Sequence, residues 1–577
     1  MAVGSRDLNR TPPTWAKRSA RRISGLLLAA LVACACGGSS STPATPLPPN
    51  TSGWWRSQVA YELFVRSFAD SDGDGIGDLK GLTAHLDALN DGKGPSSTNS
   101  LGVDLVWLMP IFPSPSYHGY DVKDYRSINP DYGTLDDFKA FVAAAHQRGV
   151  KVLLDMVLNH SSSQHPWFQD SIRGPVSAKY DWFVWRPVDP GWISPVSGST
   201  NAFRYAGTAP GYYYAVFDAG MPDLNLLNPA VEQELVDSMK FWLALGVDGF
   251  RLDAVRYFVE GTSGTSGELV DQPGTHAFLK RVRAALQATY PNTLLVAEAW
   301  ATPDLTATYY GSGDEAQLAF SFYLTTGTST TSGATGILGA AISGRASDLA
   351  TVVTRYETAL AGKDRGFEAP IISNHDVGRA MRRLMGQEAE ARVATATLLA
   401  MPGTPFIYYG DEIGMQGAMT DPAKRTPFHW NATGPSYGFT TKATTWYEDY
   451  NGVARPTEAV GVDLESQRAD PTSLWNLHRS LIALRHAQAP LATGDATMPT
   501  VSGGGAGAFA LLRTAAGKRV LFVANYAAAA SGPFTVAVPG TPGVLLDGGL
   551  SGLPTSAGGT LTLPGLAGRS FAFLSLD

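Results

Sequence analysis

Eight short runs rich in Val, Ile, Leu, Phe and Tyr follow one another along this chain, and longer segments with helical spacing separate them. Segments 136–149 and 231–246, for example, repeat apolar residues every three to four positions. Strands that alternate with helices in this way form parallel sheets, and eight such units can close into a barrel. The sequence therefore predicts the α/β class and a (β/α)8 TIM barrel, with strands at 59–68, 103–112, 150–159, 247–255, 294–300, 318–323, 369–374 and 405–409.

Two stretches fall outside this alternation. The segment between the third and fourth strands is long, aromatic and rich in Gly, Pro and Ser, which predicts an inserted subdomain at the mouth of the barrel. After the helical segment 473–488, short alternating strands with Gly and Pro turns predict a C-terminal all-β sandwich domain. We therefore expect a barrel domain over 54–160 and 226–489, an inserted subdomain over 161–225 and a β domain over 490–577.

The N-terminal segment predicts export. Four basic residues between 17 and 22 precede an apolar stretch, 23–33, that is short for a membrane span and typical of a signal peptide. Leu-Val-Ala then leads into Cys34, an order that resembles the lipobox of bacterial lipoproteins, in which this cysteine is lipidated. An ordinary secretory signal is the alternative, but Cys34 and Cys36 are the only cysteines and both lie beside the predicted cleavage site.

We therefore expect a signal peptide over 1–33, a lipid anchor at Cys34, a flexible Gly/Ser/Thr/Pro-rich tether over 34–53, and a lipoprotein held at the cell surface or in the periplasm. Residues 1–33 carry six Lys or Arg against one Asp, so their removal lowers the formal charge from −7 to −12. A chain with this net negative charge binds polyanions poorly. Nucleic acid and anionic membrane surfaces are therefore not expected as partners. We expect a monomer that touches the membrane only through its lipid.

Three acidic residues come directly after three different predicted strands. Asp253 follows the fourth strand, Glu298 the fifth and Asp376 the seventh. A single strand-end acid more often caps a helix or pairs with a base than it catalyses. Because the reacting groups of such barrels lie at the carboxyl ends of the strands, however, the three together predict one pocket.

A pair of carboxyl groups, one protonated and one ionised, is what cleavage of a glycosidic bond requires. Arg251 lies two residues before Asp253, on the same face of the strand, where it would keep that carboxylate ionised. Glu298 lies between Ala297 and Trp300, a less polar setting that would raise its pKa.

Four motifs, DMVLNH at 155–160, GFRLDAV at 249–255, EAW at 298–300 and SNHD at 373–376, resemble the signature regions of glycoside hydrolase family 13, the α-amylase family. The resemblance covers residues from about 54 to 577 and implies a retaining glycoside hydrolase. It implies that Asp253 is the nucleophile, Glu298 the general acid/base and Asp376 the residue that holds the distorted sugar. It also implies a subsite for the attacked sugar. Tyr120 would be the stacking platform of this subsite, and His160, Arg251, His375 and His118 would line the rest of it.

The sequence gives mixed signals about which member of the family this is. MPDLN at 221–225 resembles a signature of bacterial enzymes intermediate between α-amylases and oligo-1,6-glucosidases. Tyr117 and His118 stand before Gly-Tyr as in α-amylases, whereas exo-acting glucosidases carry at the position of Tyr117 an Asp that helps close the site around a chain end. RTPFHW at 425–430 resembles the RTPMQW segment of those glucosidases, including Arg425, whose Asp partner is missing.

From these signals we expect an endo-acting α-amylase that cleaves α-1,4 bonds in starch or maltodextrins, with Ala254 after the nucleophile arguing against α-1,6 specificity. Without its Asp partner, Arg425 would be free to bind other groups or solvent. The alternatives are an α-glucosidase, a maltodextrin-degrading enzyme or a glucanotransferase, which share the covalent intermediate. A non-catalytic glucan-binding lipoprotein is the remote alternative.

Residues 70–78 read DSDGDGIGD and place acidic oxygens at alternate positions, as a hard cation requires. The loop resembles the start of an EF-hand, although position twelve is Gly81 rather than Glu; a solvated turn is the alternative. Since crowded carboxylates repel one another, and glucosidase-like family members bind calcium at a matching loop, we expect Ca²⁺ with ligands Asp70, Asp72, Asp74, Asp78 and the Ile76 carbonyl. A second calcium at Asn159 and Asp223, with Tyr257 replacing the family's usual His, stays open.

Overall fold

The computed structural model describes residues 53–207, 211–264, 266–326, 335–363, 366, 368–434 and 436–577. The predicted signal peptide, Cys34 and the tether up to residue 52 therefore lie outside the described residues. Within the described ranges, no helix combines the length and the apolar character that a membrane crossing needs.

Eight parallel strands form the centre of the fold, in the order β10-β9-β8-β7-β3-β2-β1-β11. Backbone hydrogen bonds of 2.9 Å from Thr404 to Glu368 and from Phe406 to Pro370 join the two ends of this sheet, which closes it. The predicted (β/α)8 TIM barrel is confirmed. Its strands are β1 (Ala60–Leu63), β2 (Leu105–Leu108), β3 (Lys151–Met156), β7 (Gly249–Leu252), β8 (Leu294–Ala297), β9 (Leu318–Phe320), β10 (Glu368–Ala369) and β11 (Phe406–Tyr408).

The observed strands are shorter than the predicted ones; β2, for example, ends at Leu108, four residues before the predicted end. Side chains fill the inside of the barrel, where the rings of Trp107, Phe320 and Phe406 lie with centroids 4.9–6.2 Å apart. The barrel is therefore a packed core, and chemistry is restricted to its ends.

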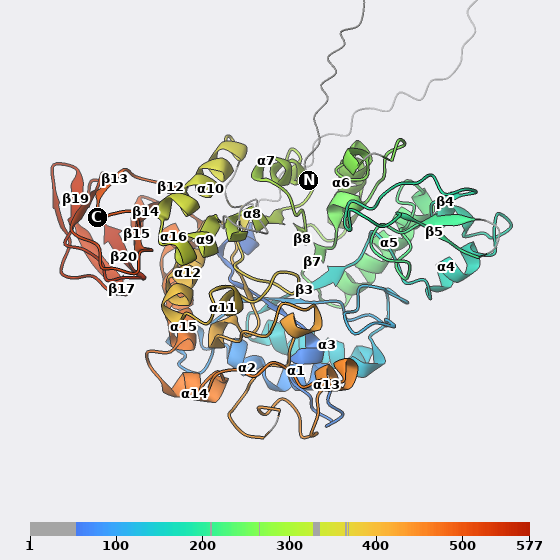
Figure 1. The fold of residues 1–577 in the computed structure, drawn as a ribbon, viewed down its shortest axis with the longest axis horizontal. Coiled ribbons are helices and arrows are strands. Elements are labelled where there is room, and N and C mark those ends of the chain that lie inside the picture. Colours follow the sequence, from blue (N-terminus) through green and yellow to red (C-terminus); the bar gives the residue numbers. More distant parts are fainter. Residues whose placement is uncertain are drawn as a thin grey trace, which may run out of the picture. The chain divides into compact units, whose positions relative to one another are not determined.

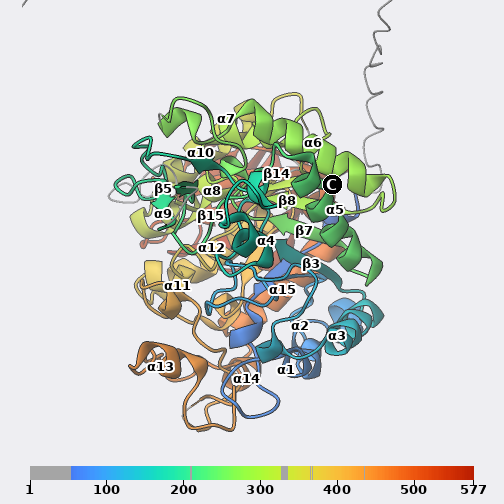
Figure 2. The same ribbon diagram turned by 90° about the vertical axis from the view of Figure 1, so that its right-hand side faces the viewer.

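Helices surround these strands; Figures 1 and 2 show α3, α5 and α6 around β3, β7 and β8. Helix α3 begins with a capping box in which Thr134 and Asp137 satisfy each other's backbone N–H groups. The helices are α1 (Leu79–Ala84), α2 (Leu86–Leu89), α3 (Leu135–Gln147), α4 (Pro166–Ser171), α5 (Pro229–Ala244), α6 (Pro273–Gln287), α7 (Pro303–Thr306), α8 (Phe322–Thr326), α9 (Gly336–Ser343), α10 (Ala346–Ala359), α11 (Ala380–Arg383), α12 (Glu388–Ala400), α13 (Trp446–Asn451), α14 (Leu464–Ala469), α15 (Leu474–Ala487) and α16 (Ala489–Thr493).

The segment between β3 and β7 folds as an insertion, as expected. It contains an antiparallel sheet of β4 (Trp185–Arg186), β6 (Tyr212–Tyr214) and β5 (Phe203–Tyr205), in that spatial order. The rings of Phe168, Trp185 and Tyr213 pack on one another with centroids 5.0–5.8 Å apart, so the aromatic residues of this segment form its core.

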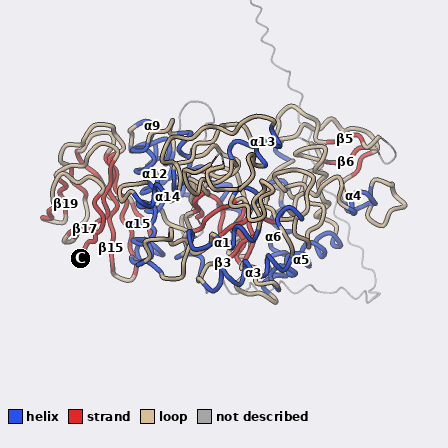
Figure 3. Tube along the Cα trace, turned by 90° about the horizontal axis from the view of Figure 1, so that it is seen from below, coloured by secondary structure: helices blue, strands red, loops and turns tan. Residues whose placement is uncertain are grey.

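The C-terminal region consists of two antiparallel sheets, with strand orders β12-β14-β15-β20-β17 and β13-β16-β19-β18, and Figure 3 shows it as strands and loops. Buried residues of both sheets, among them Leu521, Val536 and Leu561, form one cluster, so the predicted all-β sandwich is confirmed. Its strands are β12 (Asp495–Thr497), β13 (Val501–Gly503), β14 (Ala508–Ala515), β15 (Lys518–Asn525), β16 (Phe534–Val536), β17 (Pro542–Asp547), β18 (Thr555–Ala557), β19 (Thr560–Leu563) and β20 (Ser570–Leu576).

Candidate active site

A cavity of about 530 Å³ lies where the barrel strands end. It brings together nearly all the residues that the sequence singled out for chemistry; Arg251 lies just beneath, with a side chain that is 1% exposed. The polar and aromatic lining includes His118, Tyr120, His160, Asp253, Arg256, Tyr257, Glu298, Trp300, His375, Asp376, Asp421 and Arg425.

One guanidinium group holds the two central carboxylates. Arg251, on β7, places Nη1 2.6 Å from Asp253 Oδ1 and Nη2 3.0 Å from Glu298 Oε2. The same Nη1 lies 2.8 Å from Asp155, at the end of β3. Since Arg251 is buried beneath all three carboxylates, it fixes their positions and balances part of their charge.

Glu298 is set up as an acid. Burial raises the pKa of Glu298 to about 8, and although Arg251 opposes this shift, the charges of Asp253 and Asp376 add to it. Glu298 Oε2 forms an ion pair with Arg251 Nη2 and accepts a hydrogen bond of 2.7 Å from the N–H of Ala254, which adopts a left-handed φ of 51°. Because both donors occupy Oε2, a proton on this carboxyl belongs on Oε1.

Asp376 is set up as a carboxylate. Burial alone would raise its pKa, but His375 Nε2 at 3.2 Å and Arg425 Nη2 at 3.3 Å from its oxygens hold that pKa well below its usual range. Burial likewise opposes a charge on His375, yet Asp376 and Glu62 raise the His375 pKa to about 9, so this imidazole is a cation at neutral pH.

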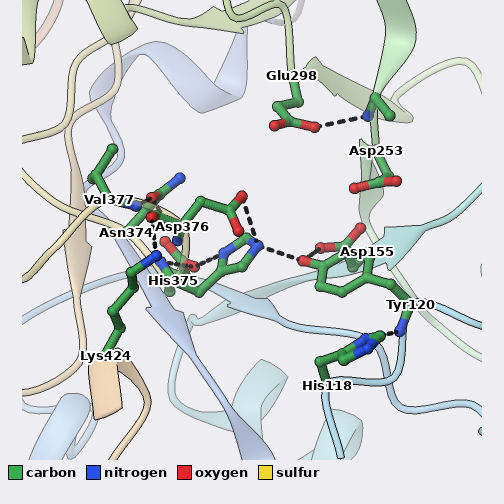
Figure 4. Close-up of polar contacts among 12 residues, drawn as sticks. His118, Tyr120, Asp155, Asp253, Glu298, Asn374, His375, Asp376, Val377 and Lys424 are labelled. Carbon is green, nitrogen blue, oxygen red and sulfur yellow. Dashed lines mark hydrogen bonds and ion pairs between the residues drawn. The ribbon is translucent and has the colours of Figure 1, made fainter. Parts of the chain in front are cut away.

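A chain of hydrogen bonds links His375 to two further carboxylates, those of Glu62 and Asp155 (Figure 4). His375 Nδ1 donates to Glu62, on β1, at 2.6 Å, and Nε2 lies 2.7 Å from the hydroxyl of Tyr120. Tyr120 in turn donates to Asp155 Oδ2 at 2.9 Å. Tyr120 is therefore held by its hydroxyl.

The other residues predicted to contact the sugar differ in their hydrogen-bond partners. His118 Nδ1 accepts the N–H of Tyr120 at 3.1 Å, which ties the two predicted residues together. Burial lowers the pKa of His160, so that ring is neutral, and its Nε2 has no hydrogen-bond partner among the described residues. His160 lines the cavity, and a buried nitrogen without a partner marks this ring as a candidate contact for a substrate hydroxyl.

Trp300 is a further lining residue, for which the sequence suggested only an apolar setting. Its side chain is 44% exposed, and its ring stacks on Phe322 with centroids 4.7 Å apart and planes 4° apart. An aromatic face held flat at a cavity rim is suited to the apolar face of a sugar ring.

Arg425, which was expected to bind other groups or solvent in place of the family's Asp, binds other groups of the chain. Asp421, four residues upstream, lies 3.3 Å from Arg425, which also donates to the hydroxyl of Tyr117 at 3.2 Å. The side chain of Arg425 is only 4% exposed. The carboxylate that pairs with Arg425 therefore comes from Asp421, in the same loop, rather than from position 117. Its only signal in the sequence is its spacing of four residues from Arg425.

The Asp/Gly loop gathers three of its four predicted carboxylates. Asp70, Asp72 and Asp78 each offer an oxygen within 4.8 Å of the others, the one such group found in the described part of the chain. Asp74 lies outside this group, and its Oδ1 accepts the N–H of Ile76 at 2.7 Å. Gly73 and Gly75 have φ values of 83° and 92°, which the tight turn requires.

At the position left open for a second calcium, Asn159 Nδ2 donates directly to Asp223, and Asp223 also accepts the N–H of Val216 at 2.6 Å. Asn159 Oδ1 is buried without a hydrogen-bond partner in the described residues. Tyr257 lines the active-site cavity.

Comparison with known proteins agrees with this geometry. A family model described as "Alpha amylase, catalytic domain" matches residues 62–494. Alpha-amylase 3 of Dictyoglomus thermophilum is 35% identical over 75% of this chain and 77% of its own. Trehalose synthase/amylase TreS of Mycobacterium tuberculosis is 33% identical over 79% and 78%. The crystal structure of α-amylase from H. orenii superposes with a TM-score of 0.74 at 33% identity, covering 90% of this chain and all of that one.

The family match spans most of the barrel, and Asp253, Glu298 and Asp376 all lie within it. The two relatives are 35% and 33% identical to this chain over 75% and 79% of its length. This chain therefore belongs to glycoside hydrolase family 13, the α-amylase family, and is a glycoside hydrolase.

Proposed function

We propose that this enzyme hydrolyses α-1,4-glucosidic bonds in starch or maltodextrins with retention of configuration. The observation that carries the proposal is the pair Asp253 and Glu298 on one buried guanidinium, with burial keeping Glu298 protonated up to about pH 8. Two carboxyl groups in different protonation states are what retaining hydrolysis requires.

In this mechanism Asp253 attacks the anomeric carbon while Glu298 Oε1 gives its proton to the leaving oxygen, so that the glycosidic C–O bond breaks and a glycosyl ester forms. Arg251 holds Asp253 Oδ1, which leaves Oδ2 to attack. Glu298 then takes a proton from water, which attacks the same carbon and releases Asp253. Asp376, kept ionised by His375 and Arg425, accepts hydroxyls of the distorted sugar.

Hydrolysis and transfer differ in the molecule that accepts the glycosyl group in the second step, which is water in hydrolysis and a sugar in transfer. The name of the mycobacterial relative, trehalose synthase/amylase, covers both outcomes for that protein, and Trp300 at the cavity rim would bind a sugar acceptor as well as a leaving sugar. Endo-acting α-amylase activity and membership of the intermediate group with the MPDLN segment stay predictions. Action on chain ends, as by an α-glucosidase, is the second candidate, and the Asp421–Arg425 pair favours it.

Proton NMR of starch and maltodextrin digests tests the proposal. We expect the α-anomer to appear first and to mutarotate afterwards, because two displacements at one carbon retain configuration. The β-anomer as first product, or no cleavage of any α-1,4-glucan, would contradict it. Products longer than the substrate would show transfer rather than hydrolysis.

We further propose that the loop 70–78 binds Ca²⁺. Asp70, Asp72 and Asp78 fit a hard cation, since their oxygens gather within 4.8 Å of one another. A chelator should therefore lower the melting temperature by a few degrees, and Asp72→Asn should remove that response. Asp136→Asn, on α3 with a side chain that is 89% exposed, is the control and should respond as the wild type does. Identical melting with and without chelator would refute the site.

The lipid anchor at Cys34 is also a proposal, supported by the order of basic, apolar and small residues before it. Cys34→Ala should move the protein from the detergent-extracted membrane fraction to soluble exported material, because one acylated cysteine is the only expected anchor. Cys36→Ala is the matched control and should stay with the membrane. Unchanged fractionation of the Cys34 variant would refute lipidation at that residue.

A further inference from the structure

Glu62 is a buried carboxylate on β1 that does not belong to the lining of the active-site cavity. Its side chain is 1% exposed, as is that of its ion-pair partner, His375. Glu62 Oε1 accepts two hydrogen bonds from this one residue, from the ring Nδ1 at 2.6 Å and from the backbone N–H at 3.3 Å. A charge buried in a barrel core is costly, so a carboxylate paired with one cavity-lining imidazole indicates a functional role.

The hydrogen-bond partners of the His375 ring require a hydrogen on each of its two nitrogens. Nδ1 faces the Glu62 carboxylate, and a carboxylate can only accept. Nε2 lies 3.2 Å from Asp376 Oδ2 and 2.7 Å from the hydroxyl oxygen of Tyr120, whose own hydrogen goes to Asp155 (Figure 4). A neutral ring would turn one bare nitrogen toward an oxygen lone pair. The ring is therefore a cation between the carboxylates of Glu62 and Asp376.

The charges around this ring act on one another. Burial opposes a charge on His375, while Asp376 and Glu62 raise its pKa to about 9. Burial also opposes a charge on Asp376, but His375 and Arg425 hold the pKa of Asp376 well below its usual range. The other titratable or charged groups that face the ring or its two carboxylates are Tyr120, Asp155, Arg251, Tyr408 and Asp411. Glu62 is the group that bonds to Nδ1, on the far side of the ring from Asp376.

We propose that Glu62 is a positioning residue for sugar binding by Asp376, because it keeps a hydrogen on both nitrogens of His375 and so holds Nε2–H toward Asp376. The inference rests on the proposed α-1,4-glucan hydrolysis, in which Asp376 accepts hydroxyls of the distorted sugar. If the ring lost a proton while Nδ1–H stayed bonded to Glu62, the bare Nε2 would face the Asp376 carboxylate. That carboxylate would then bind the distorted sugar less well, so kcat should fall more than KM rises.

NMR of ¹⁵N-histidine-labelled protein measures the protonation of His375 directly, and His375→Gln identifies its signals among those of the ten histidines. In the wild type we expect a doubly protonated ring up to about pH 9. Glu62→Gln keeps the side-chain size and an acceptor oxygen but removes the charge, so the ring should lose its proton about one to three pH units lower. Glu62→Asp keeps the charge and should titrate closer to the wild type.

The activity should follow the same titration. On maltoheptaose, Glu62→Gln should come closest to the wild type in kcat/KM at acidic pH, and its kcat/KM should fall about tenfold per pH unit once the ring has lost its proton. Glu298 itself gives an alkaline limb, so the effect is also measured on an aryl α-glucoside in the Glu298→Gln background. There the shift of the limb caused by Glu62→Gln should coincide with the NMR titration of His375.

Glu412→Gln is the matched control. Glu412 is likewise a buried carboxylate, 2% exposed, and its hydrogen bonds come from the hydroxyl of Tyr61 at 2.7 Å and the N–H of Gly410 at 2.9 Å rather than from His375. Its replacement removes a buried charge of the same kind and should leave the titration of His375 and the pH profile as in the wild type. A melting curve for each variant identifies any that fails to fold.

An unchanged titration of His375 in Glu62→Gln would overturn the proposal, as would a loss of kcat/KM that is equal at every pH, which general damage to the fold would produce. A His375 ring that is neutral at pH 7 in the wild type would overturn it even if Glu62→Gln did not fold. A wild type that cleaves no α-1,4-glucan would mean instead that the proposed function has failed, and the NMR titration then decides whether Glu62 holds the ring protonated.

Discussion

Replacement of Asp253 by Asn should lower kcat on any α-1,4-glucan by at least about 10⁴-fold, with little change in the free energy of unfolding. An amide cannot form the glycosyl ester, so the first step has no nucleophile. The fold should tolerate the change because Arg251 keeps Asp155 at 2.8 Å and Glu298 at 3.0 Å and is not left as an unpaired buried charge. Initial rates and thermal melting measure the two effects.

Asp136→Asn, on the outer helix α3, serves as the control and should match the wild type in both measurements. Mass spectrometry must show that the amide introduced by Asp253→Asn has not deamidated back to the carboxylate. If an intact variant then hydrolyses starch within tenfold of the wild type, Asp253 is not the nucleophile.

The barrel was predictable because its strands are buried on both faces and therefore read as continuous apolar runs. Every residue of β2, Leu105–Leu108, is buried, and so is every residue of β8, Leu294–Ala297. Asp253, Glu298 and Asp376 each follow one of these runs. Because parallel strands all end on the same side of the barrel, the three residues could be predicted to be neighbours.

Contacts that depend on loop shape were not predictable. Asp421 and Tyr117 are 304 positions apart, and no periodicity indicates that the two side chains meet. The sequence showed an arginine without its usual partner and left open whether other groups or solvent bind Arg425 instead. Glu62 gave a weak signal, a charged residue inside the apolar first strand, but its partner His375 lies 313 positions away. The apolar neighbours of Glu298 predicted that its pKa is raised, but the size of that rise depends on how far the whole fold buries the carboxyl group.

Replacement of Glu298 by Gln should lower kcat/KM on glucans by about 10²- to 10⁴-fold, the contribution of a positioned proton donor. The loss should shrink on an aryl α-glucoside with an acidic phenol, because that leaving group departs without a proton. Asp253→Asn, in contrast, should be equally inactive on both substrates, since each needs the nucleophile. The ratio of the two activities therefore separates the acid from the nucleophile.

The pH dependence of kcat/KM is a second test of Glu298 as the acid. An acid works only while protonated, so a pKa raised to about 8 should keep kcat/KM constant through neutral pH and make it fall above about pH 8. Glutamine does not titrate, so this alkaline limb should be absent from the Glu298→Gln profile on the aryl glucoside. An alkaline limb at the same pH in both proteins would assign it to another group, and an equal loss on glucan and aryl glucoside would remove the acid role from Glu298.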